Sequence, residues 1–219
     1  MKSKIVTSHD GVALNCAVSS SSNSNKWIVL IIPFGLKVEL AKSFFDYFED
    51  DFNIVTWESR LILSEEKVTL SENDFSIENH IADINSIEAA LNIENSTLVG
   101  YCSGAGIALA AANKNPNKYS QLLLVHGEFT LLGDKACVTQ VGSDIDSILP
   151  IASLSQEKAQ FIMERVSMDS NNSASNLPDN IDINLPFKNS NYLYRYAINY
   201  LSYRQVDFES LAKRLKHKT

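Results

Sequence analysis

The residues best placed to do chemistry lie in the segment Gly100-Tyr101-Cys102-Ser103-Gly104. A short apolar run precedes this segment and a helix of small residues follows it, which is the order of strand, tight turn and helix that a nucleophile elbow requires. A nucleophile on such a turn needs clearance two residues before and two residues after it, and Gly100 and Gly104 give this clearance to Cys102. Ser103 lacks glycines at these positions. The register therefore selects the thiol of Cys102, and the alternative interpretation is a buried cysteine in an ordinary strand-to-helix turn.

The composition is that of a globular protein large enough for one α/β domain, or for a core with a small appended subdomain. The chain has 219 residues, of which 45% are apolar and 21% charged, and its net charge is −7. The acidic balance argues against a nucleic-acid or anionic-membrane surface. The sequence also lacks the long apolar run of a transmembrane helix or a signal peptide. We therefore expect a cytoplasmic protein that binds neither nucleic acid nor membrane.

The cysteines and histidines do not have the spacing of metal ligands. Cys16, Cys102 and Cys137 are odd in number and far apart, and they form no Cys-x-x-Cys pair. We expect no disulfide framework, no metal and no other cofactor. A reducing compartment also suits a catalytic thiol.

Strand and helix patterns alternate along the first two-thirds of the chain. Lys4–Thr7 and Val12–Val18 flank Asp10-Gly11, which predicts a hairpin. The alternation from Trp27 onward predicts a mostly parallel sheet with helices on both faces. The expected strands after the hairpin are residues 27–32, 52–57, 96–101 and 121–125, and the expected helices are 38–48, 77–91, 103–113, 156–168 and 191–204.

With these motifs in place, the chain resembles the α/β-hydrolase superfamily from about residue 3 to about residue 132. The resemblance is carried by the hairpin at Asp10-Gly11, the loop Ile31–Gly35, the turn Val55–Arg60 and the elbow Gly100–Gly104. It implies a hydrolase core of strands one to six in residues 1–132. It also implies a helical cap in residues 133–219, with a mobile loop at about residues 169–188. The C-terminal strands seven and eight of the family are missing from this pattern.

The resemblance also implies roles for individual residues. Cys102 takes the position of the nucleophile, and the backbone N–H groups of Phe34 and Ser103 take the positions of the two oxyanion donors. His126 and Glu128 follow the sixth strand on the same sheet edge as the elbow, and they are candidates for the catalytic base and acid. The alternative for His126 is a histidine that packs at the end of a strand.

For three further groups of residues, we prefer a structural interpretation to a functional one. Tyr192, Tyr196, Tyr200 and Tyr203 share one side of the last long helix, either as a packing stripe or as an aromatic lid over a substrate pocket. Glu58 and Arg60 are expected to form an ion pair that braces a loop. His80 is expected on an exposed helix face.

A cysteine in the elbow resembles dienelactone hydrolases, polyhydroxyalkanoate synthases and cysteine-type thioesterases and acyltransferases. The implied activity is that of a hydrolase or acyltransferase, which forms an acyl-enzyme on Cys102 with a small-molecule acyl thioester or ester, free or bound to a carrier protein. The alternative is a catalytically incomplete protein of this fold that acts as a binding module or depends on a partner. The incomplete form is expected to expose an apolar sheet edge where strands seven and eight should pair, which favours self-association.

Overall fold

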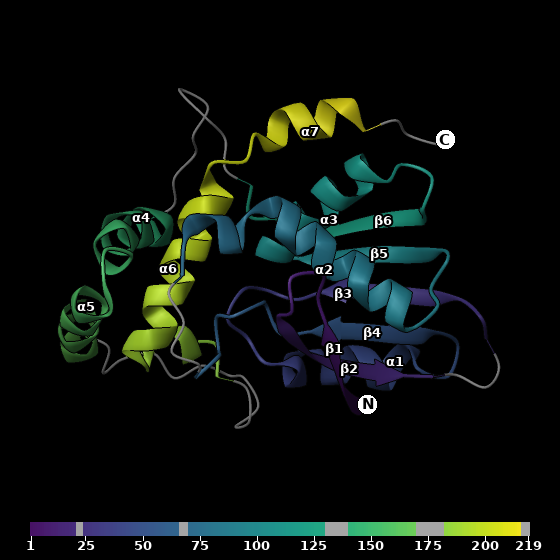
Figure 1. Cartoon of the computed structure of the whole chain (residues 1–219), viewed down its shortest axis with the longest axis horizontal. Helices are drawn as coiled ribbons and strands as arrows, with labels where there is room; N and C mark the ends of the chain where they lie inside the picture. Colours follow the sequence, from purple (N-terminus) through teal and green to yellow (C-terminus); the bar gives the residue numbers. More distant parts are fainter. Residues whose placement is uncertain (21–23, 66–69, 130–139, 170–181, 216–219) are drawn as a thin grey trace.

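The fold is built on one six-stranded sheet, shown in Figure 1. The computed structural model describes residues 1–20, 24–65, 70–129, 140–169 and 182–215. The strands are β1 (Lys2–Thr7), β2 (Ala13–Ser19), β3 (Trp27–Ile31), β4 (Asn53–Trp57), β5 (Ser96–Tyr101) and β6 (Tyr119–Val125). They lie side by side in the order β1-β2-β4-β3-β5-β6. β1 and β2 form the predicted antiparallel hairpin, β2 also pairs antiparallel with β4, and the remaining pairs are parallel.

Helices cover both faces of the sheet. On one face, α1 (Lys42–Phe48) and the 3-10 turn η1 (Val38–Ala41) bury apolar side chains against β3 and β4. On the other face lie α2 (Ile77–Ala90) and α3 (Ser103–Lys114), with the 3-10 turn η2 (Glu72–Phe75) before α2. α2 presents the predicted isoleucine stripe, in which Ile84 and Ile87 are fully buried. The mostly parallel α/β architecture expected from the sequence is confirmed.

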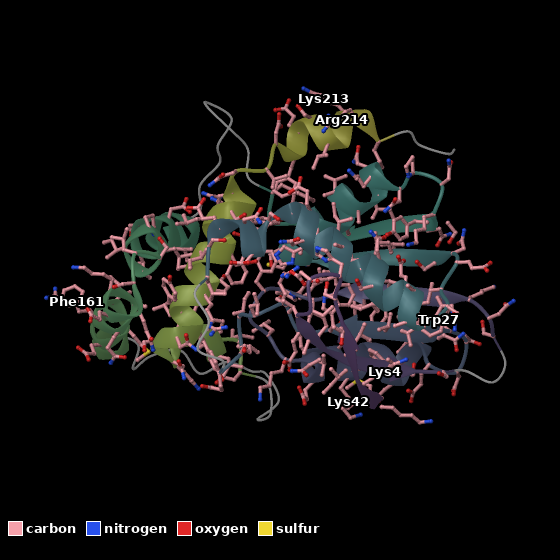
Figure 2. All side chains as sticks on the ribbon, viewed as in Figure 1. Lys4, Trp27, Lys42, Phe161, Lys213 and Arg214 are labelled. Atoms are coloured by element: carbon pink, nitrogen blue, oxygen red, sulfur yellow. The ribbon has the colours of Figure 1, made fainter. Side chains whose placement is uncertain are left out.

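Beyond β6, the described residues form helices only. These elements are α4 (Gln140–Ala152), α5 (Gln156–Asp169), the 3-10 turn η4 (Leu185–Phe187), α6 (Ser190–Arg204) and α7 (Phe208–Arg214). α4, α5 and α6 share a small core of their own, which includes Leu149, Ile162 and Tyr200. They form a helical cap beside the carboxyl ends of the parallel strands β3, β4, β5 and β6 (Figure 1). Figure 2 shows Phe161 at the outer end of this cap, at the opposite end of the molecule from Trp27.

The division into residues 1–132 and 133–219 needs one correction. α7 leaves the cap and packs against α3 of the core, where Phe208 is buried in the main apolar cluster. The range expected to be cap therefore ends on the core. The boundary at residue 132 lies outside the described residues, as do residues 170–181 of the expected mobile loop.

The turn after β4 is held by a buried arginine, although not in the way the sequence suggested. Arg60 is 1% exposed and forms ion pairs with Asp83 of α2 and with Asp10 of the β1–β2 turn. Glu58 instead accepts a hydrogen bond from Asn15. The expected Glu58–Arg60 pair is wrong, because Arg60 points into the core and joins the first hairpin to α2.

β6 forms an edge of the sheet and is far more exposed than the strands beside it. β3 and β4 are almost entirely buried, whereas Leu123, Leu124 and Val125 of β6 have exposed fractions of 45%, 38% and 41%. Within the described part of the chain, no strand pairs with the outer side of β6. The structure thus has the open apolar edge that the sequence predicted.

Candidate active site

Cys102 occupies a strained turn between β5 and α3. Its backbone angles are φ 53° and ψ −122°, which a residue with a side chain rarely adopts and which cost about 1–3 kcal/mol. The conformation is fixed from both sides, because the Cys102 N–H donates to the carbonyl of Val125 (3.0 Å) and the Ala105 N–H donates to the carbonyl of Cys102 (3.0 Å). The side chain is thereby held away from the strand at the N-terminus of α3, as an elbow nucleophile requires.

The two flanking glycines are required by close backbone contacts. A Cβ atom on Gly100 would lie 2.6 Å from the Cα atom of Ala105, and one on Gly104 would lie 2.3 Å from the carbonyl oxygen of Ile31. Both neighbours are main-chain atoms, which a change of rotamer cannot move. The glycines therefore let α3 approach β5 and the end of β3 closely enough to form the elbow.

The carboxylate of Glu128 is the titratable group that contacts the thiol. Cys102 Sγ lies 3.9 Å from Glu128 Oε2, within the range of a weak hydrogen bond that the thiol donates. The Glu128 N–H donates to the carbonyl of Cys102 (3.3 Å), so the loop after β6 is attached to the elbow by its main chain as well. The predicted proximity of Glu128 to Cys102 is therefore present in the structure.

Two tyrosines of the cap helix α6 position Glu128. The Tyr200 hydroxyl donates to Glu128 Oε1 (2.8 Å), and the Tyr203 hydroxyl donates to the main-chain carbonyl of Glu128 (2.6 Å). Tyr200 and Tyr203 are buried. The tyrosine stripe thus divides: Tyr200 and Tyr203 face the elbow, whereas Tyr192 bonds to Glu65 at the far end of the helix.

The electrostatics of the site favour a neutral thiol at rest. Burial and, after it, the negative charge of Glu128 raise the pKa of Cys102 above its ordinary value, although the Ser103 N–H partly opposes this. The same two causes, in the same order, raise the pKa values of Tyr200 and Tyr203. The tyrosines consequently remain hydrogen-bond donors at neutral pH.

The two backbone N–H groups expected as oxyanion donors interact with different partners. The Ser103 N–H interacts with the thiol of Cys102, whose pKa it lowers. The Phe34 N–H donates to Ser103 Oγ (3.0 Å), a buried contact. An oxyanion can use the Phe34 amide only after the Ser103 hydroxyl releases it, so this half of the expected oxyanion hole is closed in the structure.

The two histidines that the sequence singled out lie in different surroundings. His126 is exposed, with φ 48°, and its ring lies edge-on to Tyr101. No hydrogen bond joins His126 to Cys102 in the described structure, so the geometry gives no support to His126 as base in this conformation. The exposed position expected for His80 is wrong: His80 is 4% exposed, and its Nε2 lies 2.8 Å from Asn199 Oδ1 of α6.

The buried position of His80 affects the site indirectly. Its ring stacks on Phe34, with the centroids 5.4 Å apart, and Tyr203 packs edge-on against the same phenylalanine (5.2 Å). Burial lowers the pKa of His80 to about 4, so it is neutral near pH 7. Sequence patterns did not reveal this packing, because Phe34, His80 and Tyr203 come from three distant segments.

The chemistry available at the site is therefore that of a thiol beside a carboxylate. Among the described residues, no group of three or more His, Cys, Asp or Glu side chains could hold a metal ion.

None of the described helices has the length and apolar character needed to cross a membrane. Cys137 lies outside the described residues, and Cys16 is a free, buried cysteine whose pKa burial raises to about 12.

Comparison with known proteins identifies the fold. The family model of the alpha/beta hydrolase fold matches residues 51–136. A solved epoxide hydrolase from metagenomes of hot environments superposes with a TM-score of 0.71 at 14% sequence identity, over 95% of this chain and 71% of its own. The fold is that of the α/β hydrolases. No curated protein sequence matches the chain.

Two other solved hydrolases superpose on nearly the whole chain with slightly lower TM-scores. The epoxide hydrolase CorEH has a TM-score of 0.69 at 13% identity, over 97% of this chain and 77% of its own. The esterase EaEST from Exiguobacterium antarcticum has a TM-score of 0.65 at 14% identity, over 95% of this chain and 76% of its own. At these identities, the superpositions establish the fold and leave the reaction to be argued from the site.

Proposed function

We propose that this α/β-hydrolase-fold protein cleaves acyl thioesters or esters through an acyl-enzyme on Cys102, with Glu128 as the group that accepts and returns protons. The observation that carries the proposal is the 3.9 Å contact between Cys102 Sγ and Glu128 Oε2 at a strained elbow. Glu128 was expected as the catalytic acid, and in this proposal it also takes the role of base expected for His126, because His126 is exposed and makes no hydrogen bond to the thiol.

The acylation step begins with transfer of the thiol proton from Cys102 to Glu128. The thiolate attacks the carbonyl carbon of the substrate, and the new C–S bond produces a tetrahedral oxyanion that the Ser103 N–H faces. Collapse of this intermediate breaks the bond to the leaving thiol or alcohol, which receives the proton from Glu128. The products are the free leaving group and an acyl group on Cys102.

Hydrolysis repeats the sequence with water. Glu128 accepts a proton from water as the oxygen attacks the acyl carbonyl, and collapse breaks the C–S bond. Glu128 then returns the proton to the Cys102 sulfur, and the acyl group leaves as a carboxylic acid. An amine or alcohol in place of water would give acyl transfer. The pair carries one negative charge at the start and at the end of the cycle.

Two physical arguments favour an activated acyl substrate. A neutral resting thiol needs an electrophile reactive enough to be attacked while the proton moves to a carboxylate. Thioesters meet this condition because their leaving thiols are good leaving groups. In addition, the buried side chains of Tyr200 and Tyr203 contact Glu128, and the lower local dielectric constant strengthens the interaction of its carboxylate with Cys102.

The test is intact-mass spectrometry after exposure to a panel of acyl thioesters. The wild type should gain one acyl group and lose it with time, and Cys102→Ala should gain none. Glu128→Gln should still gain the acyl group, because loss of the neighbouring charge lowers the pKa of the Cys102 thiol, and it should retain the acyl group, because the attack of water has lost its base. An adduct that persists in Cys102→Ala, or that turns over equally fast in Glu128→Gln, would contradict the proposal.

A second candidate is a catalytically incomplete protein of this fold that acts as a binding module. The observation that favours it is the closed oxyanion site, since the Phe34 N–H is bound to Ser103 Oγ. This candidate predicts that folded protein binds acyl compounds without a covalent adduct on Cys102. Ligand-induced thermal stabilisation without any mass change would therefore support it against the first proposal.

A further inference from the structure

The outer edge of β6 has the features of a pairing surface. The pairing of β6 with β5 is irregular at the start of β6. From Gln121 to Val125, the strand contains no charged residue and no proline. Natural sheets usually protect such an edge with lysine, proline or a bulge. In this protein, the exposed fractions of Leu123, Leu124 and Val125, all near 40%, instead offer an apolar edge.

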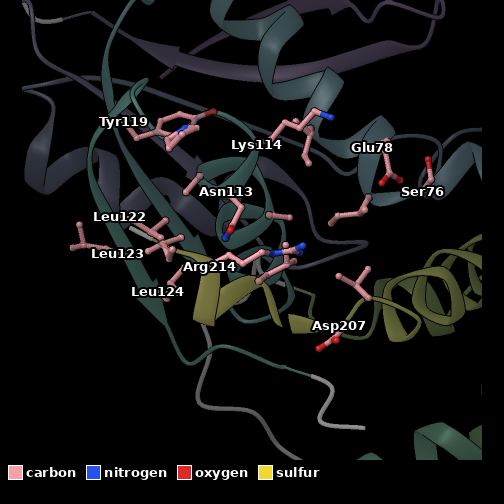
Figure 3. A pocket seen from close by; sticks show the side chains of 18 of the residues that line it. Ser76, Glu78, Asn113, Lys114, Tyr119, Leu122, Leu123, Leu124, Asp207 and Arg214 are labelled. Atoms are coloured by element: carbon pink, nitrogen blue, oxygen red, sulfur yellow. The ribbon is translucent and has the colours of Figure 1, made fainter. Parts of the chain in front are cut away.

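A groove runs alongside the same strand on the α2–α3 face. Its volume is about 1360 Å³, and Leu122, Leu124, Ile81 and Leu211 contribute to its lining (Figure 3). Cys102 does not line it, so the groove is separate from the candidate active site. The edge and the groove together form one continuous surface, referred to below as the β6 surface.

The β6 surface has positively and negatively charged side chains at different places on its rim. Arg214 ends the seven-residue helix α7 and lies beside Leu122–Leu124 in Figure 3. Lys114 ends α3, which runs antiparallel to β6, so this cation lies near the amino end of the strand. Glu78 is in the first turn of α2 and Asp207 precedes α7, so these anions lie near its carboxyl end. All four side chains belong to exposed residues that line the groove.

We infer that the β6 surface binds a second copy of this chain, with the two β6 strands antiparallel across a two-fold axis. A closed dimer that pairs one strand with its own copy must be antiparallel. This axis reverses the direction of the strand, so the basic end of one groove meets the acidic end of the other. The charge pattern is therefore complementary to itself, and pairing joins the two sheets into one of twelve strands.

The first experiment measures sedimentation velocity over a wide range of protein concentration. The wild type should be a monomer–dimer mixture. Leu123→Lys should raise the dimer dissociation constant by about tenfold or more, because each copy buries an unpaired charge. Leu154→Lys, which changes a leucine on the cap that is 71% exposed, is the matched control and should leave the constant unchanged.

A charge exchange tests the orientation. Lys114→Glu combined with Arg214→Glu should weaken the dimer, because both ends of the groove then carry negative charge. Adding Glu78→Lys should restore part of the affinity. A weakened dimer that the third change does not rescue would overturn the assigned antiparallel geometry.

Cross-linking supplies a measurement that does not depend on affinity. In an antiparallel pair related by a two-fold axis perpendicular to the sheet, one residue must face its own copy at a distance that allows a disulfide. Single cysteines at positions 121 to 125, in a background without Cys102 and Cys137, should therefore give one position that oxidises to a dimer far faster than its neighbours. A wild type that stays monomeric, assembles beyond a dimer, or shows no preferred cross-linking position would overturn the inference.

Discussion

Replacing Glu128 by glutamine separates the two effects that this residue has on Cys102. The substitution keeps the shape of the side chain and leaves the Tyr200 hydroxyl an oxygen to which it can donate. It removes a negative charge 3.9 Å from Cys102 Sγ. The pKa of Cys102 should therefore fall, because the charge of Glu128 is one of the causes that raise it.

The size of the effect follows from the distance between the two groups. At 3.9 Å, two like charges repel by about 1 kcal/mol in water and by about 4 kcal/mol at an effective dielectric constant of about 20. This range corresponds to a decrease of about one to three units in the pKa of Cys102. A thiolate of lower pKa is also less nucleophilic, and this offsets about half of the gain in logarithmic terms. Alkylation near neutral pH should thus be about 3- to 30-fold faster in Glu128→Gln.

The assay is the rate of carbamidomethylation by iodoacetamide as a function of pH, followed by intact mass. A Cys137→Ser background limits the reaction to Cys102, because Cys16 is buried and its pKa is about 12. Glu94→Gln, at an exposed position before β5, is the matched control and should leave the profile unchanged. Glu128→Gln should shift the profile to lower pH.

Slower alkylation of Glu128→Gln would refute a resting neutral thiol at Cys102. If Glu128→Gln alkylates more slowly than the wild type at every pH, the carboxylate stabilises the thiolate and the resting thiol is not the form derived above. The proposed mechanism also requires opposite signs in two assays: faster alkylation and slower hydrolysis of the acyl-enzyme. Equal signs would separate Glu128 from the proton transfers.

Three further predictions concern the elbow and its surroundings. Gly104→Ala should abolish cooperative thermal unfolding, because its Cβ would lie 2.3 Å from a main-chain carbonyl oxygen, and a normal melting curve would contradict this geometry. Ser103→Ala should free the Phe34 N–H to bind the oxyanion, and the rate of acylation should rise by about 2- to 10-fold, which corresponds to one hydrogen bond. Stopped-flow kinetics would measure this rate. A slower rate than in the wild type would mean that the Ser103 hydroxyl assists acylation. His80 has a pKa lowered from 6.5 to about 4, so its contribution to stability is present above pH 6.5 and is lost as the pH falls towards 4. Between pH 7.5 and pH 4.5, the free energy of unfolding, measured with urea, should fall by about 2.5 kcal/mol more in the wild type than in His80→Gln. If the free energies of the two proteins fell in parallel with pH, the depressed pKa of His80 would be refuted.

The sequence predicted the parts of the structure that depend on neighbouring residues. The hairpin at Asp10-Gly11, the strands and the elbow at Cys102 follow from local turn chemistry and from periodicity, and all are present. Gly100 and Gly104 were identified from spacing, and close main-chain contacts explain why both positions need glycine.

The parts that the sequence did not predict depend on residues far apart in the chain. Tyr200 is 72 positions from Glu128, and Asn199 is 119 positions from His80. A helical stripe of tyrosines indicates one packed face without indicating its partner, and a histidine in a polar helix turn has the same local pattern whether it is buried or exposed. The hydrogen bond from Phe34 to Ser103 was also beyond prediction, because it depends on a side-chain rotamer.

The attachment of Glu128 to α6 has a consequence for how this fold can be divided or recombined. Its side chain is held by Tyr200 and its main chain by Tyr203, so the carboxylate next to the nucleophile is positioned by a helix of the cap. The core supplies the strained cysteine, and the cap positions the Glu128 carboxylate, which accepts a hydrogen bond from the cysteine thiol. Core and cap are therefore not interchangeable modules: a chimera with a foreign cap would keep the elbow and lose control of the thiol.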